Sequence, residues 1–93
     1  MTVMTTLKIG VEDVVDGRIT NPERLWGFEG HLEVMANLGR IQVPRIYVSG
    51  RIHIEAGSDI EAGEGIKAGE GIKAGWGIEA GEGIKAGWGI EAG

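Results

Sequence analysis

Two carboxylates and an imidazole alternate over residues 29–33, in the sequence Glu29-Gly-His31-Leu-Glu33. Side chains two residues apart point to the same face of a β-strand. Carboxylate and imidazole groups are ligands that several divalent metals accept, so one interpretation of this cluster is a metal site. The alternative is a solvated strand face, which is the commoner use of such a pattern. We expect the second, and the sequence predicts neither a metal nor a cofactor.

The second histidine, His53, lies between Ile52 and Ile54, and strand alternation would turn it outward. A histidine base of the acyltransferase type needs a pocket for its substrate, and no neighbouring motif builds one. The chain also lacks a Ser-His-Asp set, a phosphate-binding glycine loop and any cysteine nucleophile. The sequence therefore predicts no catalytic residue and a protein that is not an enzyme.

Trp76 and Trp88 occupy positions that Glu or Ser holds elsewhere in a repeat. Exposed aromatic side chains suit a protein interface, whereas the alternative is a ring lying flat on glycine backbone. Acidic residues surround both, and clustered carboxylates can imitate a nucleic-acid backbone in the basic groove of a protein. The candidate partner-binding residues are Trp76, Trp88, Glu64, Glu70 and Glu82.

Composition limits the remaining classes of function. The 93 residues make one small domain with a net charge of −5, and 18 of them are glycine. Direct nucleic-acid binding needs clustered Lys and Arg, which an acidic chain does not supply. No apolar run approaches the roughly 18 residues of a membrane span, and no signal-peptide pattern opens the chain. With no cysteine present, we expect a cytoplasmic protein without a membrane partner.

The elements that must position these residues are set by an internal repeat. From Ile54 to the final Gly93, the unit Ile-(Glu/Lys)-Ala-Gly-x-x recurs every six residues without a slip. Glycine costs about 1 kcal/mol relative to alanine in a helix, which excludes an α-helix here. Ile and Ala two residues apart match a strand with one buried face, and glycines allow tight corners. The repeat predicts an all-β fold: a short parallel β-solenoid with a small N-terminal α+β cap.

We expect three hexads in each triangular coil, so that residues 18 apart stack. This predicts one acidic wall, one basic wall and one wall of alternating charge. The predicted stacks are Glu61 on Glu79, Lys67 on Lys85, Glu55 on Lys73 and Glu91, Ser58 on Trp76, Glu64 on Glu82 and Glu70 on Trp88. A rival coil of 12 residues would place Trp76 over Trp88. The residues themselves leave the handedness of the coil open.

Three segments follow from the repeat pattern within a single domain. Residues 54–93 form the regular solenoid, and 32–53 read as degenerate solenoid strands. Residues 1–31 read as a cap over one end of the coil, with a helix starting at Asn21-Pro22. We expect Leu25, Trp26 and Phe28 to plug the open mouth of the isoleucine column.

The other end of the solenoid carries no predicted cap. Unpaired strand edges are templates for further strand pairing, and the isoleucine column would be open there. Ile84, Ile90 and Ala92 are therefore the candidate self-association residues. We expect a homo-oligomer, in the simplest case a dimer formed by end-to-end stacking.

The repeats starting at Ile54-Glu55-Ala56-Gly57 resemble the hexad repeats of bactofilins, the polymer-forming bacterial cytoskeletal proteins. The resemblance covers residues 41–93 and implies a right-handed β-solenoid that joins end to end without nucleotide. Left-handed hexapeptide acyltransferases fit less well, because their repeats favour glycine directly after the aliphatic residue. Residues 1–31 match no family pattern. The resemblance implies a self-associating structural or interaction module.

A second hypothesis rests on size and charge. A small, free-standing acidic protein is similar in these respects to phage-encoded inhibitors of bacterial defence, such as anti-CRISPR proteins. That similarity implies an inhibitor whose acidic, tryptophan-bearing wall blocks a nucleic-acid-binding partner.

Overall fold

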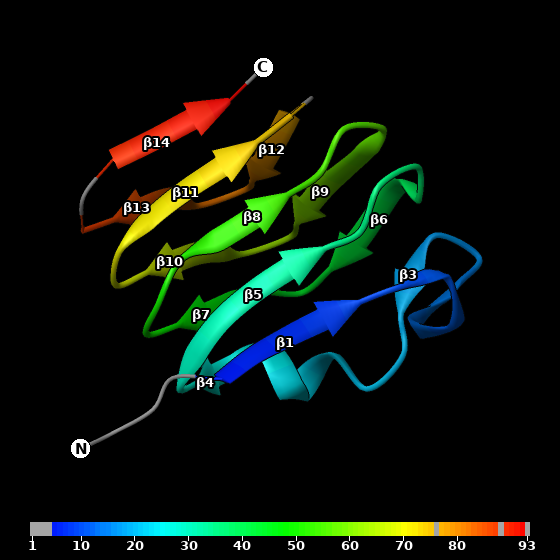
Figure 1. The fold of residues 1–93 in the computed structure, drawn as a ribbon, viewed down its shortest axis with the longest axis horizontal. Helices are drawn as coiled ribbons and strands as arrows, with labels where there is room; N and C mark the ends of the chain where they lie inside the picture. Colours follow the sequence, from blue (N-terminus) through cyan, green and yellow to red (C-terminus); the bar gives the residue numbers. More distant parts are fainter. Residues whose placement is uncertain (1–4, 76, 88, 93) are drawn as a thin grey trace.

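The computed structural model describes residues 5–75, 77–87 and 89–92, and nearly every regular element in them is a short strand (Figure 1). Two single-turn 3₁₀ helices, η1 (Val11–Asp13) and η2 (Pro22–Leu25), lie near the start of the chain. The strands are β1 (Thr5–Ile9), β2 (Val14–Val15), β3 (Arg18–Ile19), β4 (Trp26–Phe28), β5 (Gly30–Val34), β6 (Gly39–Val43), β7 (Ile46–Val48), β8 (Ile52–Ile54), β9 (Ser58–Ala62), β10 (Gly65–Ala68), β11 (Gly71–Ala74), β12 (Gly77–Ala80), β13 (Gly83–Ala86) and β14 (Gly89–Ala92).

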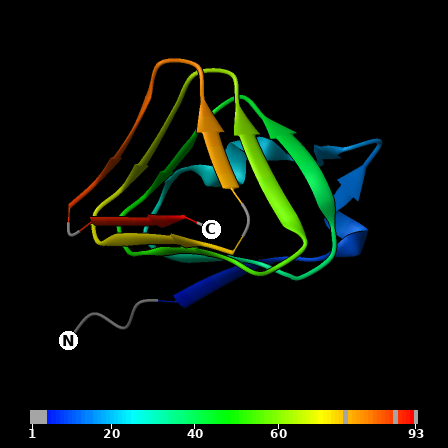
Figure 2. The same cartoon turned by 90° about the horizontal axis from the view of Figure 1, so that it is seen from above.

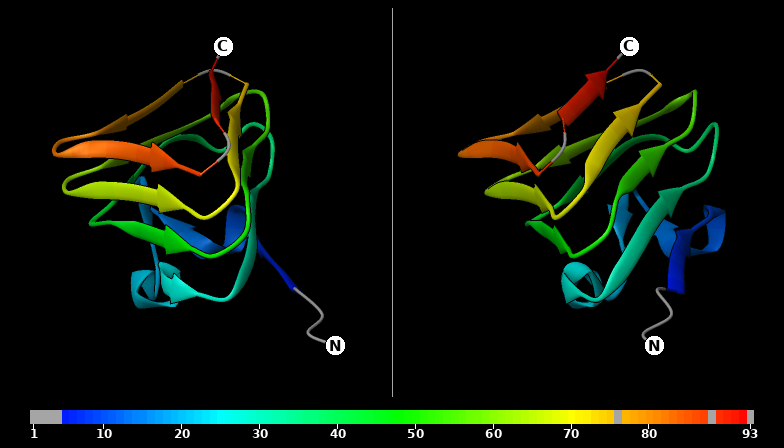
Figure 3. Two further views of the ribbon diagram at one scale, coloured as in Figure 1. Left: turned by 90° about the vertical axis from the view of Figure 1, so that its left-hand side faces the viewer. Right: turned by 60° about the vertical axis from the view of Figure 1, so that its left-hand side comes forward.

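These strands form three parallel sheets that enclose one core, as the view in Figure 2 shows. Wall A has the order β1-β5-β8-β11-β14, wall B the order β2-β3-β6-β9-β12, and wall C the order β4-β7-β10-β13. Successive strands visit the walls in turn, and each coil stacks on the one before (Figure 3). The only antiparallel pair in the described part of these sheets is β2 with β3, joined by Asp16 and Gly17 at positive φ. The predicted parallel β-solenoid is confirmed, with about four turns.

The coil is right-handed. In Figure 1 the strands of wall A lie in front and run from left to right, and the coils follow one another from the bottom of the view to the top. Figure 2 shows the chain circling counterclockwise as it approaches the viewer. This hand is the one that nearly all strand–crossover–strand connections adopt, and the one that the bactofilin resemblance implied.

The regular part of the solenoid has an 18-residue coil. Ile66 pairs with Ile84 on wall C, and Ile72 pairs with Ile90 on wall A. The charged residues follow the same register: Glu61 stacks with Glu79, Lys67 with Lys85 and Lys73 with Glu91. These pairs confirm the predicted triangular coil and exclude the 12-residue alternative.

The prediction for Glu55 is wrong. The earlier coils are two residues longer on walls A and C, so His53 rather than Glu55 stacks with Lys73, and Ile54 stacks with Ala74. Because Ile52 and Ile54 already supply the buried side chains of wall A, Glu55 falls in the following turn. Ala56 is exposed for the same reason. The hexad pattern begins at Ile54 in the sequence but enters the regular register only on β9.

The core is a column of aliphatic side chains that the strands place on alternate positions. Most of these side chains are less than 2% exposed, and they stack on their counterparts in neighbouring coils. Fully burying one such side chain stabilises the fold by about 1.5–3 kcal/mol. Alanine replaces the second aliphatic residue in the regular coils, so the column narrows there. The buried set is Ile9, Ile19, Leu25, Leu32, Val34, Ile41, Val43, Ile46, Val48, Ile52, Ile54, Ile60, Ala62, Ile66, Ala68, Ile72 and Ala74.

The first coil closes the N-terminal mouth of this column. Leu25 is fully buried and Phe28 is half-buried, as predicted for the plug. Trp26 does not belong to it, because β4 places Trp26 beside Tyr47 on the outer face of wall C, and 40% of Trp26 is exposed. The Arg45 guanidinium lies 4.8 Å from the centre of its ring. The helix start at Asn21-Pro22 is present as the 3₁₀ helix η2.

Candidate self-association and interaction sites

The outermost strands at the C-terminal side of the solenoid are β12, β13 and β14, each at the end of its sheet. We call their outward-facing edges the last-coil edge; within the described ranges no strand pairs with it. Ile84 is half-buried and Ile90 is 47% exposed, whereas Ile66 and Ile72 directly beneath them are 1% and 2% exposed. The edge therefore combines unpaired backbone groups with incompletely covered isoleucines.

The predicted self-association residues meet at this edge. Ile84 lies on β13, and Ile90 and Ala92 lie on β14, where Ala92 pairs with Ala74. The strands of the edge repeat the sequence of the strands on which they stack: β10 and β13 both read Gly-Ile-Lys-Ala. The edge strand β13 thus repeats the covered strand β10 in sequence and differs from it in having no described strand on its outer side.

The predicted partner-binding acids occupy two different corners. Glu64 lies between β9 and β10, and Glu82 lies in the equivalent turn one coil later. The Glu82 N–H donates to the Glu64 carbonyl oxygen at 2.8 Å, which confirms their predicted stacking, and both side chains are exposed. Glu70 lies in the next corner, between β10 and β11. Trp76 and Trp88, with the predicted stacks on Ser58 and Glu70, lie outside the described residues.

The three walls carry different charges on their outer faces, as the 18-residue register predicted. Wall B carries Glu61 and Glu79, wall C carries Lys67 and Lys85, and wall A pairs Lys73 with Glu91. On wall B, Arg40 compensates part of the negative charge: it contacts Asp59 at 3.3 Å and Glu61 at 3.2 Å. The acidic wall is therefore partly neutralised at its middle coil.

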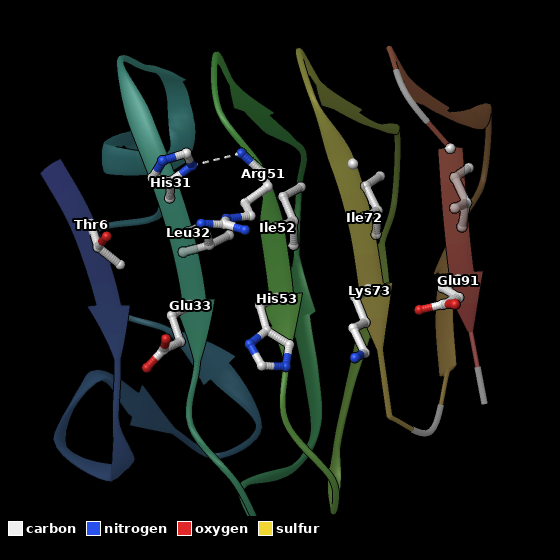
Figure 4. Close-up of a pocket in the computed structure, with 13 residues that line it drawn as sticks. Thr6, His31, Leu32, Glu33, Arg51, Ile52, His53, Ile72, Lys73 and Glu91 are labelled. Atoms are coloured by element: carbon white, nitrogen blue, oxygen red, sulfur yellow. Dashed lines mark hydrogen bonds between the residues drawn. The ribbon is translucent and has the colours of Figure 1, made fainter. Parts of the chain in front are cut away.

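Wall A carries a groove of about 730 Å³ that runs across its strands. In Figure 4, one side of it is formed by His31 and Arg51, and the other by Glu33, His53, Lys73 and Glu91. Gly71 and Gly89 leave the groove open toward the last-coil edge. The sequence reasoning placed no pocket beside His53 and missed this groove. The sequence feature that indicates the groove is the glycine one position before the isoleucine in both β11 and β14.

His31 has a structural role in the groove. Its Nδ1 accepts a hydrogen bond from the Arg51 backbone N–H at 3.0 Å, so this imidazole nitrogen is used by the fold. Glu33 stacks with His53 in the wall A register, and Glu29 lies in the bend before β5. Within the described ranges, no group of three or more His, Cys, Asp or Glu side chains is placed to hold a metal ion. The alternating side chains of residues 29–33 therefore contribute to one face of β5 and to the hydrogen bond between His31 and Arg51.

No helix in the part of the chain that the structure describes is long and apolar enough to cross a membrane. No protein-family model, curated protein or solved structure matches the chain. The fold and the last-coil edge thus define the class: a short right-handed parallel β-solenoid with three differently charged walls.

Proposed function

We propose that this β-solenoid is a self-associating structural module, and that two copies join end to end through the last-coil edge. The observation that carries the proposal is the exposure of Ile90. It occupies the same position on β14 as the buried Ile72 on β11, and it lacks only the next layer. A second copy would supply that layer together with partners for the unpaired edge groups.

Two further features support this function. The regular coils resemble those of bactofilins, for which end-to-end joining is characteristic. At the opposite end, Leu25 and Ile19 of the first coil are themselves buried, so the isoleucine column is covered there. The core column is covered near Leu25 and exposed at Ile90, and this difference favours a discrete dimer over a filament. With no cysteine in the chain, we place this module in a reducing compartment such as the cytoplasm.

The proposal is tested by the mass in solution, measured by light scattering over a range of protein concentrations. We expect a dimer for the wild-type chain and a monomer for Ile90→Asp, because the carboxylate would be buried without a partner. Val15→Asp is the matched control, since Val15 is an exposed apolar residue on β2. A monomeric wild-type protein would overturn the proposal, and so would an Ile90→Asp protein that still forms dimers.

Glu64 and Glu82, which stack in equivalent turns of successive coils, favour a second candidate function. In it, the protein is an acidic inhibitor that occupies the basic groove of a partner protein. Two exposed carboxylates on successive coils would present a repeated negative charge, which Arg45 compensates in part at Glu64. A poly-arginine peptide serves as a probe of such a groove. We expect Glu64→Gln with Glu82→Gln to weaken its binding more than Glu12→Gln with Glu23→Gln does. Equal losses would show that net charge alone attracts the peptide.

A further inference from the structure

The last-coil edge is a step. Strands β11, β12 and β13 complete one coil, and β14 begins the next by stacking on β11. Because the coil climbs as it turns, β14 projects further from the solenoid than β12, which stacks on β9 (Figure 3). Any second copy must fit this step.

A two-fold dimer can place its axis through any one of the three walls. An axis through wall A sets the projecting β14 against itself and holds the other strands apart. An axis through wall B sets the recessed β12 against itself and leaves a gap there. An axis through wall C sets β13 against β13 and, twice, the projecting β14 against the recessed β12. Only this last arrangement lets the two steps interlock.

We infer that the two-fold axis of the dimer passes through wall C; this inference rests on the proposed end-to-end dimer. In this arrangement like charges oppose the association of the two copies, so salt controls it. Lys85 on β13 then faces Lys85 of the second copy, with a Lys67 behind each. Glu79 on β12 faces Glu91 on β14 of the second copy. Residues across an antiparallel pair lie within about 8 Å, directly opposite or on the diagonal, and like charges there are destabilising.

Lys85 and Glu79 have like charges as register neighbours, Lys67 and Glu61, whereas Glu91 has Lys73 beside it on wall A. Among the described residues, the ion pairs join Arg24 to Asp13, Arg40 to Asp59 and Glu61, and Arg45 to Glu64. None involves Lys85, Glu79 or Glu91. Screening by salt shortens the reach of exposed charges. We therefore expect the dimer to tighten as the salt concentration rises.

The other two axes give opposite signs, which makes the arrangement testable. An axis through wall A would set Glu79 against Lys85, and an axis through wall B would set Lys85 against Glu91. Removing the charge of Lys85 strengthens the dimer only with the axis through wall C. Reversing the charge of Glu79 strengthens it with that axis, weakens it with the axis through wall A, and leaves the Glu79 contacts repulsive with the axis through wall B.

The experiment measures the dimer dissociation constant by analytical ultracentrifugation at low and high sodium chloride. We expect Glu79→Lys to tighten the dimer by about tenfold at low salt, because two symmetric repulsions become attractions. Lys85→Ala should tighten it less strongly. Glu12→Lys and Lys8→Ala are the controls, because they change the net charge equally at exposed positions near the opposite end of the solenoid.

Each outcome decides between arrangements. Tightening by both edge variants and not by their controls supports the axis through wall C. Weakening by Lys85→Ala overturns it. A weakening by Glu79→Lys then selects the axis through wall A, and an unchanged dissociation constant selects the axis through wall B, while the end-to-end dimer stands. A wild-type chain that is monomeric at every salt concentration overturns the proposed function itself.

Discussion

Ile90 lies directly over Ile72 in the register of wall A, yet Ile90 is 47% exposed and Ile72 is only 2% exposed. The two residues have the same neighbours along the chain, Gly before and a charged residue after. Their environments differ because Ile72 has a strand on both sides and Ile90 has a strand on one. In a stacked repeat, the exposed fraction of an isoleucine thus depends on whether coils cover it on both sides, and not on its position in the hexad.

This difference predicts unequal stability losses in the same repeat position. Ile72→Ala should lower the free energy of unfolding by about 2–5 kcal/mol, the usual loss for a large aliphatic side chain in a core. Ile90→Ala should lose well under half as much in the monomer. Urea denaturation at a protein concentration below the dimer dissociation constant measures both. Equal losses would mean that the edge is covered within one chain.

Glycine is required at some repeat positions and replaceable at others. A Cβ on Gly69 would clash with the Ser49 carbonyl oxygen in the coil beneath, whereas a Cβ on Gly63 meets nothing within 4 Å. Gly69→Ala should therefore lower the thermal midpoint clearly, because backbone must move apart. Gly63→Ala should leave the midpoint unchanged or raise it slightly, since alanine restricts the unfolded chain. Differential scanning calorimetry compares the two, and a similar loss for both would contradict the stacking geometry.

Ser58 is the one fully buried polar side chain among the described residues. Its hydroxyl donates to the Met35 carbonyl oxygen and accepts from the Leu38 N–H at 3.0 Å, so it holds the turn between β5 and β6. Ser58→Ala leaves these groups without their partner, and a loss of about 1–3 kcal/mol in unfolding free energy should follow. Thr20→Ala, which removes an exposed hydroxyl, is the control. Chemical denaturation of both variants tests the assignment.

Arg40 compensates charge on wall B through its contacts with Asp59 and Glu61. Because its side chain is largely exposed, Arg40→Ala should lower the unfolding free energy by less than about 1 kcal/mol. The loss should shrink at high salt, where the carboxylates of Asp59, Glu61 and Glu79 are screened from one another. Urea unfolding at low and high sodium chloride measures it. A loss that does not depend on salt would point to packing by the arginine stem instead.

The residues that the sequence placed correctly are those whose position depends on the hexad alone. The 18-residue register, the charge of each wall and the stacking of Glu64 with Glu82 follow from counting along a uniform repeat. The two errors have different causes, a change in coil length for Glu55 and the outward face of a strand for Trp26. Glu55 was assigned by extending the period back to Ile54, but the 20-residue spacing of the preceding coils on walls A and C moves it into a turn. Trp26 was assigned to the plug by its size, and β4 turns it to the outside.

The sequence by itself determined the local preferences: strands from Ile and Ala at alternate positions, corners from glycine, and a repeating pattern of outward charge. Those preferences act over a few residues, so they can be read from the chain. The tertiary structure decided the hand of the coil, the two-residue lengthening of the earlier coils, the groove beside His53 and the step at β14. Each of these depends on which strand lies above or below another, and that contact joins residues about twenty positions apart.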